Sequence, residues 1–174
     1  MKKRYIVQLV VVLVSVVAVF ARMQFVGRHY ERTIAEGRTV LLALAPIDPR
    51  SLMQGDYMIL RYEDPESLNW EQARKKLPHV GTLIYRVDEN RVATFARIDR
   101  GEPLAQGEVR LKYRNHRGGP RIGPGSFFFQ EGHAELYEEA RFAVLRVAED
   151  GQALLTGLAD EKHRRLGHGK AGGR

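Results

Sequence analysis

The sequence predicts an α+β, β-rich fold of antiparallel strands and hairpins with two short helices, preceded by one N-terminal transmembrane helix. An uncharged apolar run at residues 6–21 predicts the first helix. From residue 38 onward, short runs rich in Val, Leu, Ile and Tyr alternate with Gly, Pro, Asn and Asp turn signals, which predicts strands. The chain has no cysteine, and this excludes a disulfide framework and thiolate metal sites.

The apolar run at residues 6–21 reads IVQLVVVLVSVVAVFA, and its only polar residues are Gln8 and Ser15. A run of this length without charge is too long for an ordinary strand, and it follows the basic start MKKR, as in export signals. As a helix it spans roughly 24 Å, and flanking apolar residues extend it toward the ~30 Å of a hydrocarbon core. We therefore expect a membrane anchor at residues 5–26, after a cytoplasmic N-terminus at residues 1–4, with the lipid bilayer as its partner.

A cleaved signal peptide is the alternative to the anchor. The small residues Val19 and Ala21 suit a signal peptidase that cuts after Ala21. The uncleaved anchor is favoured because the long apolar run contains no helix breaker before that position. The tight basic cluster at residues 2–4 favours an N-terminus on the inside. The expected location is the bacterial cytoplasmic (inner) membrane, as a single-pass protein with its domain on the periplasmic or outer side.

The net charge of +7 belongs to the two ends of the chain. Residues 1–22 carry +4 and residues 162–174 carry +5, which leaves −2 for residues 23–161 out of the total of +7. A basic face with interleaved aromatic side chains is therefore not expected, and nucleic acid is excluded as a partner. The basic tail at residues 161–174 has almost no apolar content and is expected to be disordered.

A short helical stalk is expected at residues 27–37, with a flexible linker as the alternative because of Gly27. One folded domain is expected to follow at residues 38–160. Strands are expected in four segments of that domain: residues 39–46, 81–98, 107–114 and 142–158. The second segment is predicted to be a hairpin that turns at residues 88–90. The last segment is predicted to be another hairpin, because Asp-Gly at residues 150–151 is a strong turn signal.

Two short helices and one loop complete the predicted domain. Asp64 is a candidate N-cap before Pro65, and Pro78 marks the end of the helix between them. The second helix is expected at residues 133–140, where apolar residues recur at helical spacing. The stretch at residues 115–125, NHRGGPRIGPG, is rich in glycine and proline, and it is interpreted as a long surface connection, with a mobile lid as the alternative.

The most informative segment is residues 46–63, PIDPRSLMQGDYMILRYE. Asp48 and Pro49 predict a turn, because aspartate caps backbone N–H groups and proline fixes φ at about −65°. A second turn is expected just before the strand. Gly55 adopts positive φ at low cost there, and Asp56 accepts hydrogen bonds from the backbone of the turn.

In the strand that follows this second turn, alternate side chains point to opposite faces. Leu60 and Tyr62 share one face with Met58, and we expect them to pack in the interior. Tyr57 lies on the opposite face. It therefore either packs under the preceding loop or is exposed to a partner, which makes it the candidate contact residue.

Residues 55–62, GDYMILRY, match in full the signature Gly-Asp-Tyr-x-x-Leu-x-Tyr. The chain thus resembles the GDYXXLXY protein family, and residues 46–50 and 128–132 are similar to further blocks of that family's pattern. The resemblance implies a membrane-anchored protein without an established activity, and it implies an integral membrane protein as partner. The nominated motif and interaction residues are Gly55, Asp56, Tyr57, Leu60, Tyr62, Asp48, Pro49, Glu131 and Gly132.

An enzyme is the alternative class. A membrane-bound serine peptidase-like enzyme using Ser51 would also combine an N-terminal anchor with an external β-rich domain. However, Ser51 lies only four residues before Gly55, and no lysine has the buried setting that a neutral general base needs. The carboxylates near His133 come with too few histidines to predict zinc. We therefore expect a membrane-anchored extracytoplasmic accessory or interaction module with no catalytic residues, no metal and no cofactor.

Overall fold

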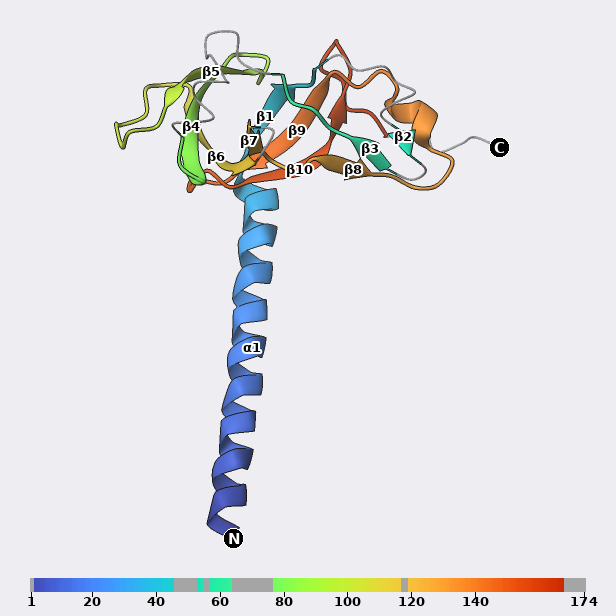
Figure 1. The fold of residues 1–174 in the computed structure, drawn as a ribbon. Coiled ribbons are helices and arrows are strands. Elements are labelled where there is room, and N and C mark those ends of the chain that lie inside the picture. Colours follow the sequence, from blue (N-terminus) through green and yellow to red (C-terminus); the bar gives the residue numbers. More distant parts are fainter. Residues whose placement is uncertain (1, 46–52, 55–56, 64–76, 117–118, 168–174) are drawn as a thin grey trace. The chain divides into compact units, whose positions relative to one another are not determined.

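The computed structural model describes residues 2–45, 53–54, 57–63, 77–116 and 119–167. The chain divides into two compact units, Met1–Glu36 and Gly37–Arg174. The first unit is one helix, and the second contains the strands of the described chain (Figure 1). The main part of the predicted fold class is confirmed, since one long apolar N-terminal helix precedes an antiparallel, β-rich region.

The helix α1 spans Lys2–Glu36 and is 35 residues long. No proline lies within it, and Gly27 does not interrupt it. Near its C-terminal end Arg32 and Glu36, one helical turn apart, form an ion pair at 2.9 Å. The part from Tyr5 to Glu36 is long and apolar enough to cross a membrane by length and composition.

The first sheet has the strand order β1-β9-β10 and is antiparallel. Its strands are β1 (Arg38–Ala43), β9 (Phe142–Val147) and β10 (Ala153–Ala159). The hairpin predicted at residues 150–151 joins β9 to β10. Gly151 has φ +84° there, and the N–H of Ala148 donates to the carbonyl of Gln152 at 2.9 Å. The first strand of the domain, β1, therefore pairs with the hairpin β9–β10 near the C-terminal end of the domain.

The second sheet has the order β5-β4-β6-β7. Its strands are β4 (Val80–Val87), β5 (Ala93–Ile98), β6 (Glu108–His116) and β7 (Gly119–Ile122). The predicted turn at residues 88–90 connects β4 to β5, where the carboxylate of Asp88 accepts the N–H of Val92 at 2.8 Å. On β6 the alternation also matches the prediction, because Leu111 and its alternate neighbours are buried while Lys112 is exposed.

Residues 115–125 are not the long surface connection that their glycines and prolines suggested. β6 continues through His116, and β7 pairs with it. Pro120 lies opposite Asn115 in this pair. A proline is tolerated at this position because β7 is the edge strand of its sheet, and an edge strand has only one neighbour to bond.

The third sheet is small and contains the motif strand. Its order is β2-β3-β8, with β2 (Met53–Gln54), β3 (Tyr57–Ile59) and β8 (Ser126–Phe128). Two isolated bridges link the sheets: Leu41 of β1 pairs with Val92 just before β5, and Leu44 after β1 pairs with Tyr62 after β3. Because both bridges lie on or next to β1, this strand connects all three sheets.

The largest apolar core joins the first and second sheets. It is formed by alternate inward-facing residues of both sheets, as expected for two packed antiparallel layers. Its fully buried members are Val40, Leu83, Leu111, Ala143 and Leu145. A second core lies under the motif strand and is formed by Met58, Leu60, Ala140 and Leu158.

The helix expected at residues 133–140 is a single 3₁₀ turn, η1 (Ala134–Tyr137), and this prediction of an α-helix was wrong. None of the four residues of η1 is buried. Of the stripe expected there, Ala134, Tyr137 and Ala140, only Ala140 is buried. A longer helix therefore lacks the packing that stabilises most short helices. The helix predicted after Asp64 lies outside the described residues.

Residues 161–167 of the tail predicted to be disordered are ordered, and residues 168–174 lie outside the described residues. The reason for this order is the carboxylate of Asp160, which is only 5% exposed. It accepts the backbone N–H groups of Lys162 and Arg164, each at 2.9 Å, and the Nε of Arg164 at 2.8 Å. The composition of residues 161–174 could not predict this turn, because the residue that orders it, Asp160, lies just before that polar segment.

Candidate functional site

The candidate site is the motif strand β3 and the segments that hold it. The two turns predicted before the motif strand lie outside the described residues, and so do the residues nominated in them: Asp48, Pro49, Gly55 and Asp56. The described part of the motif begins at Tyr57. From there β3 lies between β2 and β8 in the small sheet.

The inner face of the motif strand follows the predicted alternation. Met58 and Leu60 are 2% and 5% exposed. The backbone N–H of Leu60 donates to the carbonyl of Gly125 at 2.9 Å, which extends the pairing of β3 with the segment that leads into β8. Leu60 therefore helps to close the second core and is also tied by its backbone to the strand beside it.

Tyr62 holds the end of the motif against a distant loop. Its side chain packs at the edge of the main core, and its hydroxyl donates to the carbonyl of Pro124 at 2.9 Å. Burial raises the pKa of Tyr62, so the hydroxyl stays protonated and remains a donor. A Cβ added at Gly123 would lie 3.0 Å from this hydroxyl, and Gly123 has φ +73°. Leu60 and Tyr62 thus pack in adjacent cores, and Leu44 contacts both of these cores.

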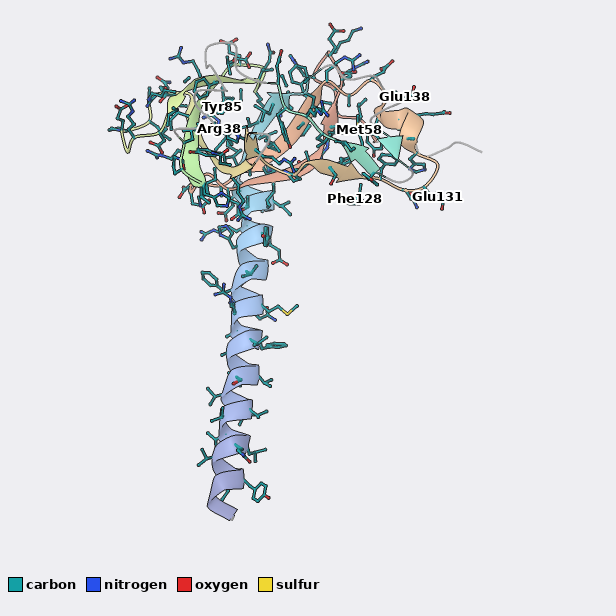
Figure 2. All side chains as sticks on the ribbon, viewed as in Figure 1. Arg38, Met58, Tyr85, Phe128, Glu131 and Glu138 are labelled. Carbon is teal, nitrogen blue, oxygen red and sulfur yellow. The ribbon has the colours of Figure 1, made fainter. Side chains whose placement is uncertain are left out.

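The outer face of the motif strand carries an aromatic pair. Tyr57 lies opposite Phe128 in the β3–β8 register, and their rings are 5.8 Å apart with a 40° tilt. Phe128 is 72% exposed, and Ile59 on the same face is 37% exposed, whereas Tyr57 is half-buried. Phe128 projects outward from β8 (Figure 2). We call Tyr57, Ile59 and Phe128 the outer aromatic face.

The second predicted block, Glu131 and Gly132, forms the turn after β8. Gly132 has φ +79°, a conformation that glycine adopts without strain. The N–H of His133 donates to the carbonyl of Gln130 at 3.0 Å and closes this turn. Glu131 itself is exposed. The backbone conformation of this turn therefore requires a glycine at position 132. The side chain of Glu131 remains at the surface.

Three aromatic residues that the sequence reasoning did not nominate support the outer aromatic face from below. Phe127 and Phe129 point inward on either side of Phe128, and the ring of Tyr137 packs against them at 5.1 Å and 5.4 Å. The signal was present in the sequence, because Phe127-Phe128-Phe129 in a strand must alternate between two faces. The packed rings under β8 leave Phe128 on the outer side.

The two chain segments that contribute to this face carry mostly negative charge. Residues 57–63 and 126–140 contain one basic residue, Arg61, and five acidic residues: Glu63, Glu131, Glu135, Glu138 and Glu139. Figure 2 shows Glu131 beyond the end of β8, whereas Glu138 lies next to η1, away from Phe128. Over the residues that the structure describes, no group of three or more histidine and carboxylate side chains could hold a metal ion.

The serine peptidase alternative needs a buried lysine, and Lys112 and Lys162, the two lysines of the domain whose side chains the structure describes, are both exposed. Ser51 lies outside the described residues. The Nζ of Lys112 forms an ion pair with Asp150 at 2.6 Å.

These features define a class of protein with one long apolar N-terminal helix and an antiparallel β domain. In that domain the motif strand β3 pairs with β2 on one side and β8 on the other. The chain belongs to the GDYXXLXY family, since the family model described as GDYXXLXY protein matches residues 19–158. The match starts within α1 and reaches into β10. Neither a curated protein nor a solved structure matches the chain.

Proposed function

We propose that this chain is a membrane-anchored extracytoplasmic module that binds an integral membrane protein through the outer aromatic face. The exposed aromatic residue Phe128, paired with Tyr57 of the motif itself, is the observation that carries the proposal. Large aromatic side chains supply much of the affinity in protein interfaces, because they bury a large apolar area with few rotatable bonds. The proposed function is recognition, with no catalytic step.

The anchor is supported by α1. Its residues from Tyr5 to Arg28 are all exposed, so the apolar side chains there are not part of a protein core. Burying such a surface in lipid removes it from water. The basic residues at positions 2–4 support an N-terminus on the cytoplasmic side and an exported domain.

The role of the outer aromatic face is supported by its position. The inner side chains of β3 and β8 explain how the small sheet is stabilised, since they fill the second core. Ile59 and Phe128 contribute little to that core, because much of each side chain stays in water. Their apolar surface is explained if a partner covers it.

Photocrosslinking in intact cells tests the proposal. A photoreactive phenylalanine derivative replaces Phe128 in the full chain. A matched chain carries it at Val80, an exposed apolar position at the start of β4 that is 56% exposed. We expect an adduct from position 128 with a protein that resists carbonate extraction, and a weaker adduct or none from position 80.

The anchor is tested in the same cells. The chain itself should stay in the membrane pellet at alkaline pH with an intact N-terminus. Release into the supernatant, or an N-terminus at residue 22, would refute the anchor. Equal adducts from positions 128 and 80 would refute the outer aromatic face as the contact surface. Adducts seen only in detergent extracts would refute it as well.

A further inference from the structure

Three polar residues of the expected anchor at residues 5–26 lie on one face of α1, whereas Gln24, near the end of the anchor, lies about 180° around the helix from Ser15. Between residues 6 and 23 the polar side chains are Gln8, Ser15 and Arg22, which follow one another at intervals of seven. Seven residues are nearly two turns of an α-helix, so each residue is displaced by only about 20° from the one before. The three side chains therefore form a stripe roughly 21 Å long, at about 1.5 Å per residue. We call it the polar stripe.

The hydrogen-bonding needs of the stripe are only partly met within the helix. The hydroxyl of Ser15 donates to the carbonyl of Val11 at 2.8 Å, which satisfies its donor. The side-chain amide of Gln8 has no hydrogen-bond partner among the described residues. A primary amide has two donors and one acceptor, and leaving them unpaired in hydrocarbon is unfavourable. Apart from these three residues, residues 6–23 present only apolar side chains to lipid.

Polar side chains within membrane-spanning helices generally face other protein segments, where hydrogen-bonding groups meet them. In a helix surrounded by lipid, nothing would favour one side for all three. Their alignment therefore marks the side of α1 that faces protein. Val12 and Val19 flank the stripe and provide the apolar contact on the same side.

A second copy of this chain is disfavoured as the partner by charge. Copies inserted with the same topology lie parallel, and the polar stripes then meet in register. Arg22 would face Arg22 of the second copy near the membrane surface, and like charges in such a pair repel. A partner helix with an acidic residue opposite Arg22 would neutralise the charge of Arg22. A hydrogen-bonding side chain opposite Gln8 would pair with the amide of Gln8.

We propose that the polar stripe Gln8-Ser15-Arg22 packs against a transmembrane helix of a different integral membrane protein. That helix carries an amide, hydroxyl or carboxyl group level with Gln8 and an acidic residue level with Arg22. The inference rests on the proposed function, because it needs the helix to remain in the membrane, and it adds a second contact independent of the outer aromatic face.

Face-specific photocrosslinking in intact membranes tests this inference. A photoreactive residue is placed at Ser15 in one full-length chain and at Val17 in another. Val17 lies only about 3 Å deeper along the axis but about 200° around the helix, so it is a matched control for depth. We expect an adduct with a membrane-spanning protein from position 15 and little from position 17. In the chain labelled at position 15, Gln8→Leu should lower the adduct yield roughly five-fold, as for the loss of one interhelical hydrogen bond. Val10→Leu on the opposite face should leave the yield unchanged.

The other outcomes overturn the inference in different ways. Equal yields from positions 15 and 17, or an adduct that Gln8→Leu does not weaken, would show that the stripe is not an interface. An adduct with the mass of two copies of this chain would show that the stripe packs against a second copy and would refute the proposed partner. Because carbonate extraction is measured on the same samples, loss of the anchor is distinguished from an anchored helix that lacks the proposed contact.

Discussion

The hydroxyl of Tyr62 donates to the carbonyl of Pro124, which lies 62 positions later in the sequence, at 2.9 Å. This bond ties the end of the family signature to the segment that leads into β8. Tyr62→Phe removes the donor and keeps the ring, so the free energy of unfolding should fall by about 1 kcal/mol. Chemical denaturation of the purified chain measures this difference. Tyr30→Phe on α1 is the control, and an equal loss in both variants would contradict the role of the bond.

Gly123 should be sensitive to any Cβ because of the same hydroxyl. Gly123→Ala places a methyl group 3.0 Å from it in a backbone with φ +73°, and Gly101→Ala meets no atom within 4 Å at φ +89°. Both variants should lose about 1 kcal/mol from the left-handed backbone, and Gly123→Ala should lose more. In the Tyr62→Phe background the excess should disappear, because the next nearest atom of that ring is 3.6 Å away. A double-mutant cycle without coupling would contradict the close approach.

The pairing of Glu108 with Arg97 should make the domain sensitive to acid. The hydrogen bond from Arg97, followed by that from the N–H of Ala105, holds the pKa of Glu108 below its ordinary value of 4.5. A depressed folded pKa gives stability that is present above the unfolded value and is lost as the pH falls through the folded value. The denaturation midpoint should therefore drop as the pH is lowered below about 4.5.

Glu108→Gln is the variant that tests this pH dependence. It should be less stable than the parent chain at neutral pH and should show a shallower acid slope, because it no longer carries the titrating carboxylate. The control is Glu89→Gln at the exposed β4–β5 turn. Parallel slopes for the parent and Glu108→Gln would contradict the assignment. Asp99, whose pKa is also lowered, first by the N–H of Gly101, accounts for part of the slope that remains.

The carboxylate of Asp160 should protect the segment after β10 from proteolysis. Burial alone would raise its pKa, but hydrogen bonds from Arg164 and Lys162 hold the pKa of Asp160 below its ordinary value. Asp160→Asn weakens these bonds, so trypsin should cleave after Lys162 and Arg164 faster than in the parent chain. Limited proteolysis followed by mass spectrometry measures the rates, with Glu138→Gln as the control. Unchanged cleavage would show that other contacts order the segment.

The sequence was sufficient to predict features that depend on local patterns. The turns at residues 88–90 and 150–151 were predicted because their residue types favour tight turns. The burial of Leu60 and the exposure of Phe128 both follow from the period of two in a strand, although only Leu60 was nominated. Periodicity and turn chemistry act over a few residues, and a single sequence contains them in full.

Features that depend on distant partners were missed. β7 is a strand because β6 offers it an edge, although its own glycine and proline oppose strand formation. Arg165 forms a bridge with Ala159 after the Asp160 turn, and the N–H of Leu166 donates to the carbonyl of Leu158 at 2.8 Å. Likewise, the acceptor for Tyr62 lies in a loop that no local pattern connects to the signature. Such contacts are set by the tertiary fold and cannot be read from a window of neighbouring residues.

The pairing of β1 with β9 has a consequence for biogenesis. Arg146 of β9 donates to the hydroxyl of Thr39 of β1 across 107 positions. A ribosome that adds about 5 to 20 residues per second needs roughly 5 to 20 seconds to deliver β9 after β1. During that interval β1 lacks the strand with which it forms its sheet, although α1 has already been synthesised. The first sheet therefore cannot be completed until β9 has been synthesised, and a polypeptide terminated before β9 should be degraded faster than the full chain.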